Sequence, residues 1–335
     1  MPCVIEKLED TPIIKFHSNT LQEVRKEFGL DRAGMIDQSL LGVNQWLEKQ
    51  HHIMKKDYCK YKKLIPIYFL MWSTAVIHIS ADGYIERLLI SCKGSVERVK
   101  EKIDKMSTTR TLLPHVFFGR YDTIDSILPK LTPKHERVYF IRNKGIRSND
   151  LMGYFRRFIK MAEYAKKYDY CLGIHIILDF TGTNIVEMMP KVGPILLLVE
   201  VKYFCKYIFN QTFQDAFSMR LKSMRFITKS KFIDLLVTLM KQVLSSKLGQ
   251  RLYVHETIDE IYDDIPKDMW PIDYGGSEKS LKELFDLDKA LTTDEFVSYL
   301  KEMSKAVTNE ELRSKVSYNE QVMGMPGSFR KLAVD

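Results

Sequence analysis

The spacing of apolar residues predicts that the first third of the chain is mainly α-helical. Within residues 20–60, Leu40 and Val43 belong to a set of apolar residues that recur at helical spacing and form one face. Residues 84–113 repeat this pattern, and Pro114 ends it because proline disrupts a helix. Two long helical segments are therefore expected before the character of the chain changes.

Short apolar segments of a different kind follow Pro133. They are rich in β-branched and aromatic residues, as expected for strands, and longer stretches of helical character separate them. This alternation predicts an α/β fold with a mostly parallel sheet and helices over at least one face. The predicted strands are Val138–Arg142, Leu172–Phe180, Met224–Thr228 and Arg251–His255. After Gly275 and Gly276, a helix is predicted over Ser277–Tyr299, and the polar tail from Val307 is expected to be loosely held.

The segment Phe232–Leu248 has an amphipathic helical pattern, with Lys231, Asp234 and Lys241 largely opposite the apolar residues. The pattern fits a helix packed on the sheet, and it also fits a helix that closes an apolar cavity and can swing away. The apolar face comprises Phe232, Leu235, Leu236, Leu239, Met240, Val243 and Leu244.

The segment Met152–Tyr164 and the residues Phe213, Phe217 and Met219 supply more bulky apolar surface than one helical layer needs. Such side chains can line a cavity for an apolar ligand, and they can equally form an ordinary core.

Charge and cysteine content indicate the kind of partner and the cellular compartment. The net charge of +8 favours an anionic partner, either nucleic acid or a membrane surface. The lysines are spread along the chain without a recognisable nucleic-acid-binding motif, so no nucleic-acid partner is expected. Five cysteines without a CxxC pair, and a start without a visible signal peptide, predict free thiols in a reducing, cytoplasmic compartment. The apolar stretch Leu64–Ser80 falls short of a membrane-spanning helix and contains Pro66.

Sequence motifs for common catalytic sites are absent. The chain has no GxGxxG or GxxxxGK[ST] phosphate loop, no GxSxG and no HExxH, and His51 and His52 are interpreted as surface or structural residues. Asp179, at the end of a predicted strand, is the best single candidate for a catalytic base. The favoured interpretation is that its carboxylate binds the backbone of the turn at 181–183. No catalytic residue, metal site or cofactor is therefore predicted.

Four stretches of the sequence, taken in order, resemble the CRAL-TRIO lipid-binding family. Within that family they are most similar to the branch of α-tocopherol transfer protein and cellular retinaldehyde-binding protein, and to its insect members. The stretches are Tyr84–Phe118, Ile174–Gly182 (IHIILDFTG), Gln214–Thr228 (QDAFSMRLKSMRFIT) and Lys247–Gly276, which ends in IPKDMWPIDYGG.

The resemblance implies an N-terminal helical domain over residues 1–125, a lipid-binding α/β domain over 126–276, and a C-terminal helix and tail over 277–335. Members of the family carry a hydrophobic ligand in an enclosed pocket and do no chemistry on it. The helix after the third strand is their gate, which implies a gate role here for Phe232, Leu235, Leu236, Leu239 and Val243.

The resemblance also implies a site for phosphoinositide headgroups. The basic positions of the tocopherol-transfer branch match Arg220 and Lys222 at the third strand, and Lys247 and Arg251 after the gate. Residues two apart on a strand share a face, as do residues four apart on a helix, so the four cations are expected to converge.

Pocket positions are implied in the same way. They match Tyr139, Phe155, Phe158, Ile159, Ala162, Leu178, Phe217, Leu221 and Met224. Phe158 stands where the tocopherol protein has a small polar residue, which argues against tocopherol itself.

The sequence departs from the family in three places. Residues 59–81 have no counterpart, and 193–210 is too long; each is either a true insertion or an unspliced segment. Lys229–Lys231 replaces the usual Asn-x-Pro after the third strand, so the gate hinge is expected to behave differently.

The expected function is non-enzymatic binding and transfer of a small hydrophobic ligand, such as a retinoid or tocopherol. Release is expected at phosphoinositide-containing membranes, with which a cytoplasmic protein associates peripherally and transiently. The alternatives are a membrane-recruited scaffold without exchangeable cargo and, less favoured, an enzyme that acts on a lipid with Asp179 as base.

Overall fold

The structure is a computed structural model of the chain. It describes residues 5–58, 83–112, 114, 125–142, 151–182, 217–286, 291 and 293–313, with the side chains of 125–126, 151–158 and 285 left aside. The two segments that depart from the family, 59–81 and 193–210, lie outside the described residues.

The first predicted helix is in fact two helices, α1 (Thr20–Glu27) and α2 (Met35–Glu48). Between them Gly29 and Gly34 have φ values of 64° and 74°. This left-handed conformation ends a helix and is open to glycine at little steric cost. The prediction of one helical segment over 20–60 was therefore wrong at 28–34 and at 49–58.

The second predicted helix is also divided, into α3 (Tyr84–Ser91) and α4 (Val96–Leu112). Lys93 and Gly94 form the turn between them, with φ values of 57° and 75°. A lysine in this region is uncommon, and local backbone hydrogen bonds from the Lys93 and Gly94 amides to Ile90 and Leu89 close the turn. The periodic pattern continued across the turn because both helices bury an apolar face against the same core.

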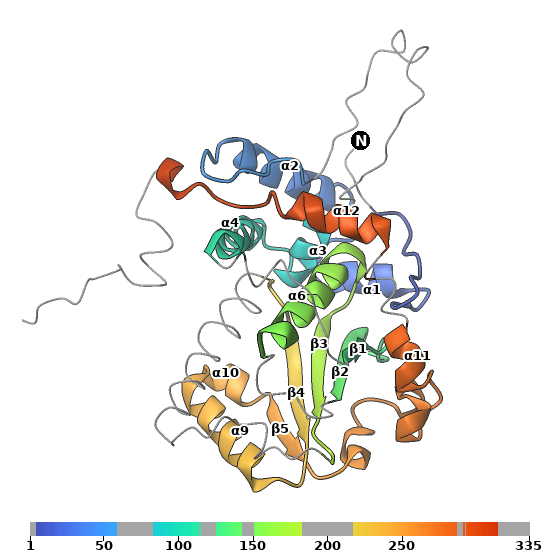
Figure 1. Cartoon of the computed structure of the whole chain (residues 1–335). Coiled ribbons are helices and arrows are strands. Elements are labelled where there is room, and N and C mark those ends of the chain that lie inside the picture. Colours follow the sequence, from blue (N-terminus) through green and yellow to red (C-terminus); the bar gives the residue numbers. More distant parts are fainter. Residues whose placement is uncertain are drawn as a thin grey trace, which may run out of the picture.

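The sheet confirms the predicted α/β fold. Its strands lie in the order β1 (Asp125–Ile127), β2 (Glu136–Arg142), β3 (Gly173–Asp179), β4 (Leu221–Ile227) and β5 (Leu252–His255). Strand β1 runs antiparallel to β2, and the other neighbours are parallel. Figure 1 shows the N-terminal helices gathered at one end of the molecule, with the sheet below them.

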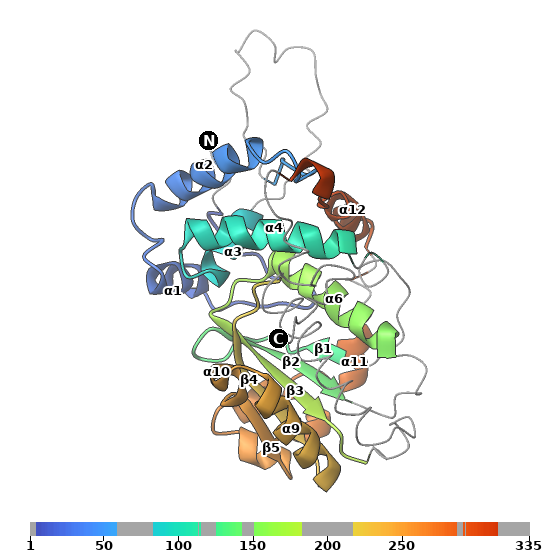
Figure 2. The ribbon, with the colours of Figure 1, turned by 90° about the vertical axis from the view of Figure 1, so that its left-hand side faces the viewer.

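Both faces of the sheet are covered. On one face, Tyr139, Ile176 and Met224 share a core with α6 (Leu151–Tyr168) and α9 (Lys231–Val243). The opposite face packs on the segment that leads into α11 (Leu281–Asp286), where Trp270 is fully buried. Figure 2 shows α9 beside β4 and β5, with α6 between the sheet and the N-terminal helices.

The C-terminal region differs from the prediction in two ways. The helix predicted over Ser277–Tyr299 is divided into α11 and α12 (Asp294–Met303). The first part of the tail is held firmly, because Thr308 pairs with Ile53 and the Arg313 guanidinium binds the Asp104 carboxylate at 2.8 Å. Residues beyond 313 lie outside the description. In the described part of the chain, no helix is both long and apolar enough to cross a membrane.

Candidate functional site

A basic cleft lies where the α3–α4 turn meets the start of β4 and the short helix α10 (Ser246–Gly249). Its volume is about 470 Å³. Among the described residues, Glu101 is the one acidic side chain in its lining. The cationic lining residues are Lys93, Arg98, Lys102, Arg220, Lys222, Lys247 and Arg251.

The structure brings together all four cations that the family resemblance indicated. Arg220 and Lys222 lie at the start of β4, Lys247 lies in α10, and Arg251 directly precedes β5. Helix α10 ends at Gly249, so Lys247 and Arg251 do not share a helical face as expected. They meet because the chain turns, and the Arg251 Nη1 group donates to the Leu221 carbonyl.

Sequence reasoning missed the three cations from the N-terminal helices. Lys93 lies on the α3–α4 turn, and Arg98 and Lys102 lie on α4. The positive charges of Arg220 and Lys247 lower the pKa of Lys93. The cations from the N-terminal helices and those from β4 and α10 therefore interact electrostatically. No local pattern in residues 93–102 predicts that this surface faces β4.

Lys222 is held at the rim of the cleft by a buried carboxylate. Its Nζ atom lies 2.6 Å from Glu136 Oε1, and His175 Nε2 lies 2.8 Å from Glu136 Oε2. Burial alone would raise the pKa of Glu136, but the hydrogen bonds from His175 and Lys222 outweigh it and lower that pKa to about 2. The carboxylate is therefore ionised and accepts from both neighbours.

His175 continues this chain of contacts to Ser223, with 2.7 Å between Nδ1 and Oγ. The order serine, histidine, carboxylate matches a nucleophile triad. However, Ser223 is only 3% exposed, and its Oγ accepts a hydrogen bond from Arg225 Nε at 3.1 Å. Because a substrate cannot reach that oxygen, the network is interpreted as a structural tie across β2, β3 and β4.

Asp179 also has a structural role, as the sequence interpretation favoured. Its Oδ1 atom accepts from the Thr181 amide at 2.8 Å, and its Oδ2 atom accepts from the Tyr274 hydroxyl. Asp179 is 1% exposed. The carboxylate thus joins the end of β3 to the Tyr-Gly-Gly segment, and both oxygens have partners.

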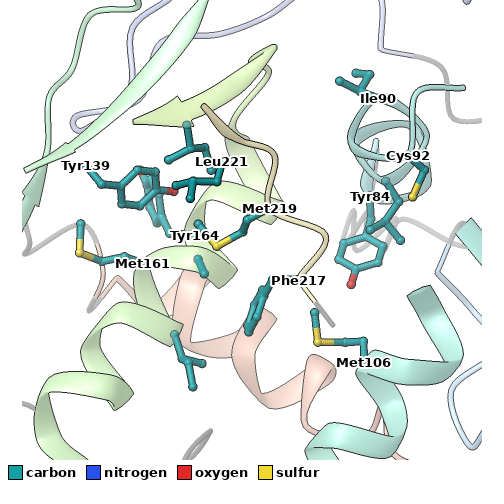
Figure 3. Close-up of a cluster of buried hydrophobic side chains, with 14 of the residues drawn as sticks. Tyr84, Ile90, Cys92, Met106, Tyr139, Met161, Tyr164, Phe217, Met219 and Leu221 are labelled. Atoms are coloured by element: carbon teal, nitrogen blue, oxygen red, sulfur yellow. The ribbon is translucent and has the colours of Figure 1, made fainter. Parts of the chain in front are cut away.

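A small apolar cavity of about 50 Å³ adjoins the cleft, and Met219 and Arg220 line both. Tyr139 and Ala162, of the predicted pocket set, line this cavity. Figure 3 shows Phe217 and Met219 between Tyr139 on one side and Met106 on the other.

The other described residues of the predicted pocket set do not line this cavity. Ile159, Phe217, Leu221 and Met224 are buried in the same core, and Leu178 is partly buried against it. The side chains of Phe155 and Phe158 lie outside those described.

One end of the small cavity is polar. Lys166 Nζ donates to Ser91 Oγ at 2.9 Å, and burial lowers the pKa of Lys166 to about 8. Burial also raises the pKa of the Cys171 thiol to about 12, so this thiol is protonated at neutral pH.

The predicted gate segment forms α9 and most of α10, and Met240 and Leu244 of its predicted apolar face are buried. Ile233, Val237 and Met240 are the buried residues of α9. Phe232, Leu236, Leu239 and Val243 are partly buried against the core. Leu235 is 52% exposed, so its assignment to an inward face was wrong. Helix α9 therefore buries one stripe and leaves apolar surface beside it in solvent.

Comparison with known proteins gives a family match and a structural match. The family description "CRAL/TRIO domain" matches residues 124–276. The match covers the sheet and α9 but just under half of the chain, and the family is one of lipid-binding and lipid-transfer proteins. Among solved structures, the crystal structure of Sfh5 matches with a TM-score of 0.38 and 11% sequence identity, over 87% of this chain and 99% of that chain.

Proposed function

We propose that the protein carries a small lipophilic molecule and docks on phosphoinositide-containing membranes through the basic cleft. The observation that carries this proposal is the convergence of seven cationic side chains on one cleft with a single carboxylate in its described lining. A multiply phosphorylated headgroup offers several charged acceptors at once, which suits such a cluster.

The position of the cleft supports coupling between membrane contact and cargo. It shares Met219 and Arg220 with the apolar cavity, and α10 follows directly on α9 in the chain. The exposed Leu235 adds apolar surface on α9, the helix that leads into α10. We propose a tocopherol-transfer or retinaldehyde-binding type of carrier, because that branch places basic residues at Arg220, Lys222, Lys247 and Arg251.

The alternative function is a membrane-recruited scaffold without exchangeable cargo. Native mass spectrometry followed by organic extraction separates the two functions. One stoichiometric apolar molecule supports a carrier, whereas no bound lipid and no uptake from a retinoid, tocopherol and phospholipid panel supports a scaffold.

Neutralising the four predicted cations tests the membrane site. The variant with Arg220, Lys222, Lys247 and Arg251 changed to Gln should bind phosphatidylinositol-bisphosphate vesicles at least tenfold more weakly, since each cation near such a surface contributes roughly 1 kcal/mol. Vesicle co-sedimentation measures this, with phosphatidylserine vesicles of equal charge as the lipid control.

A matched protein control changes Lys49, Lys279, Lys282 and Lys301 to Gln, because these exposed lysines lie outside the cleft and alter net charge equally. A second cleft variant, with Gln at Lys93, Arg98 and Lys247, leaves the partly buried Arg220 and Arg251 intact. Equal binding by the control and both cleft variants would contradict the proposal.

A further inference from the structure

We propose that Glu136 competes with the anion of the basic cleft for Lys222. Glu136 binds the ammonium group of Lys222 until a phosphate group takes the place of its carboxylate. This inference rests on the proposed headgroup site and assigns to Glu136 the role of setting its affinity. The ion pair between Lys222 Nζ and Glu136 Oε1, at 2.6 Å, is the contact that must exchange.

The path of the Lys222 side chain is specific. A Cβ atom at position 173 would lie 2.6 Å from both Cγ and Cε of Lys222. Lys222 therefore crosses β3 over the bare backbone of Gly173 to reach Glu136 on β2, and any larger residue at 173 would block this route. Without that glycine, the lysine would be turned toward the cleft.

The acceptor is fixed, whereas the donor can move. Glu136 is 7% exposed and is held by His175 through its second carboxylate oxygen. The side chain of Lys222 is 34% exposed, and Lys222 already lines the cleft. When Lys222 leaves, the Glu136 carboxylate keeps its hydrogen bond with His175. This remaining hydrogen bond limits the free energy lost in the exchange.

The other cations of the cleft bring the phosphate to Lys222. Lys247 and Lys93 are exposed and line the same cleft, so they can bind an incoming headgroup first. A phosphate monoester carries up to two charges and three acceptor oxygens, against the single charge of Glu136. A weakly charged anion therefore does not displace Glu136 from Lys222, whereas a phosphate monoester does.

A double-mutant cycle on the full chain tests this competition. Titration calorimetry with inositol 1,4,5-trisphosphate as the probe compares wild type, Glu136→Gln, Lys222→Met and the double variant. Glu136→Gln should tighten the Kd roughly threefold to fivefold, as expected for removal of a partly exposed ion pair. Lys222→Met should weaken binding, and Glu136→Gln should then have no effect in the Lys222→Met background.

The outcomes separate this inference from the proposed site. Suppose that wild type binds the probe but Glu136→Gln leaves the Kd unchanged, or changes the Kd equally with Lys222 and with Met at position 222. The proposed competition is then wrong, and the proposed headgroup site is unaffected. If neither wild type nor any variant binds the probe or bisphosphate vesicles, the headgroup site itself is wrong, and the competition with it.

Two further measurements test the competition even if the Glu136→Gln variant does not fold. Gly173→Ala keeps Glu136 but blocks the path of Lys222, and should also tighten binding of the probe. In wild type, the ammonium resonance of Lys222, followed by ¹⁵N NMR, should shift on addition of the probe as the contact with Glu136 breaks. An unshifted Lys222 resonance at saturation would overturn the inference.

Discussion

Lys166 places an amine inside the apolar cavity beside α6, where burial lowers its pKa from 10.5 to about 8. In the unfolded chain this amine keeps its proton up to about pH 10.5, whereas in the folded protein it loses the proton near pH 8. Below pH 8 both states are charged, and the folded protein bears the full cost of burying an ammonium group.

Lys166→Met should therefore stabilise the protein at pH 7, by on the order of 1–3 kcal/mol. The advantage should shrink as the pH rises from 8 to 10.5, because over that range the unfolded state binds more protons and wild type gains stability. Urea unfolding at several pH values measures this, with the exposed Lys301→Met as control. A difference that does not vary with pH would contradict the shifted pKa.

Helix α9 is the element on which the carrier function depends. Its buried stripe holds it on the sheet, while Leu235 remains 52% exposed between partly buried neighbours. Helix α9 leads into α10 at the cleft, and an exposed leucine on it can enter the apolar layer of a membrane once the cations have docked.

Leu235→Glu should weaken binding to bisphosphate vesicles several-fold without changing the melting temperature. Half-burial of a leucine contributes roughly 1 kcal/mol, and a carboxylate also repels the anionic surface. Thr238→Glu, an exposed position on the same helix, supplies the matched charge control. If the two substitutions weaken vesicle co-sedimentation equally, the proposed membrane contact of Leu235 is wrong.

A buried ion pair joins the helical layer to the α/β layer. Arg110 on α4 binds Glu163 on α6, and their side chains are 1% and 4% exposed. The Tyr299 hydroxyl of α12 adds a contact to the second oxygen of Glu163 at 3.4 Å. Three helices from distant parts of the sequence thus meet at one carboxylate.

Arg110→Met should destabilise the protein by about 3–5 kcal/mol, because it leaves Glu163 buried without its cation. Adding Glu163→Gln should restore a substantial part of that loss, since the double variant buries no charge. Thermal or denaturant unfolding of the two single variants and the double variant measures this. Additive losses would show that the two side chains do not depend on each other.

The sequence by itself determined the order of the four parallel strands and the class of fold, but not the antiparallel strand β1. Period-two and apolar segments marked β2 to β5 within a few residues, because a buried strand needs a continuous local pattern. The interpretation of Asp179 also held, because a carboxylate followed by Thr181 and Gly182 is a local turn arrangement. Helix ends were placed less well, since periodic burial continued across Gly29 and Lys93.

Only the tertiary structure decided how the basic cleft is built. The resemblance supplied its four basic positions from β4 and the α10–β5 turn, but Lys93, Arg98 and Lys102 join them only because the α3–α4 turn packs over the start of β4. The pairing of Lys222 with Glu136 likewise depends on the register of three parallel strands and on the missing side chain at Gly173. Local patterns encode which face of a segment is buried, whereas convergence of charges depends on which segments meet.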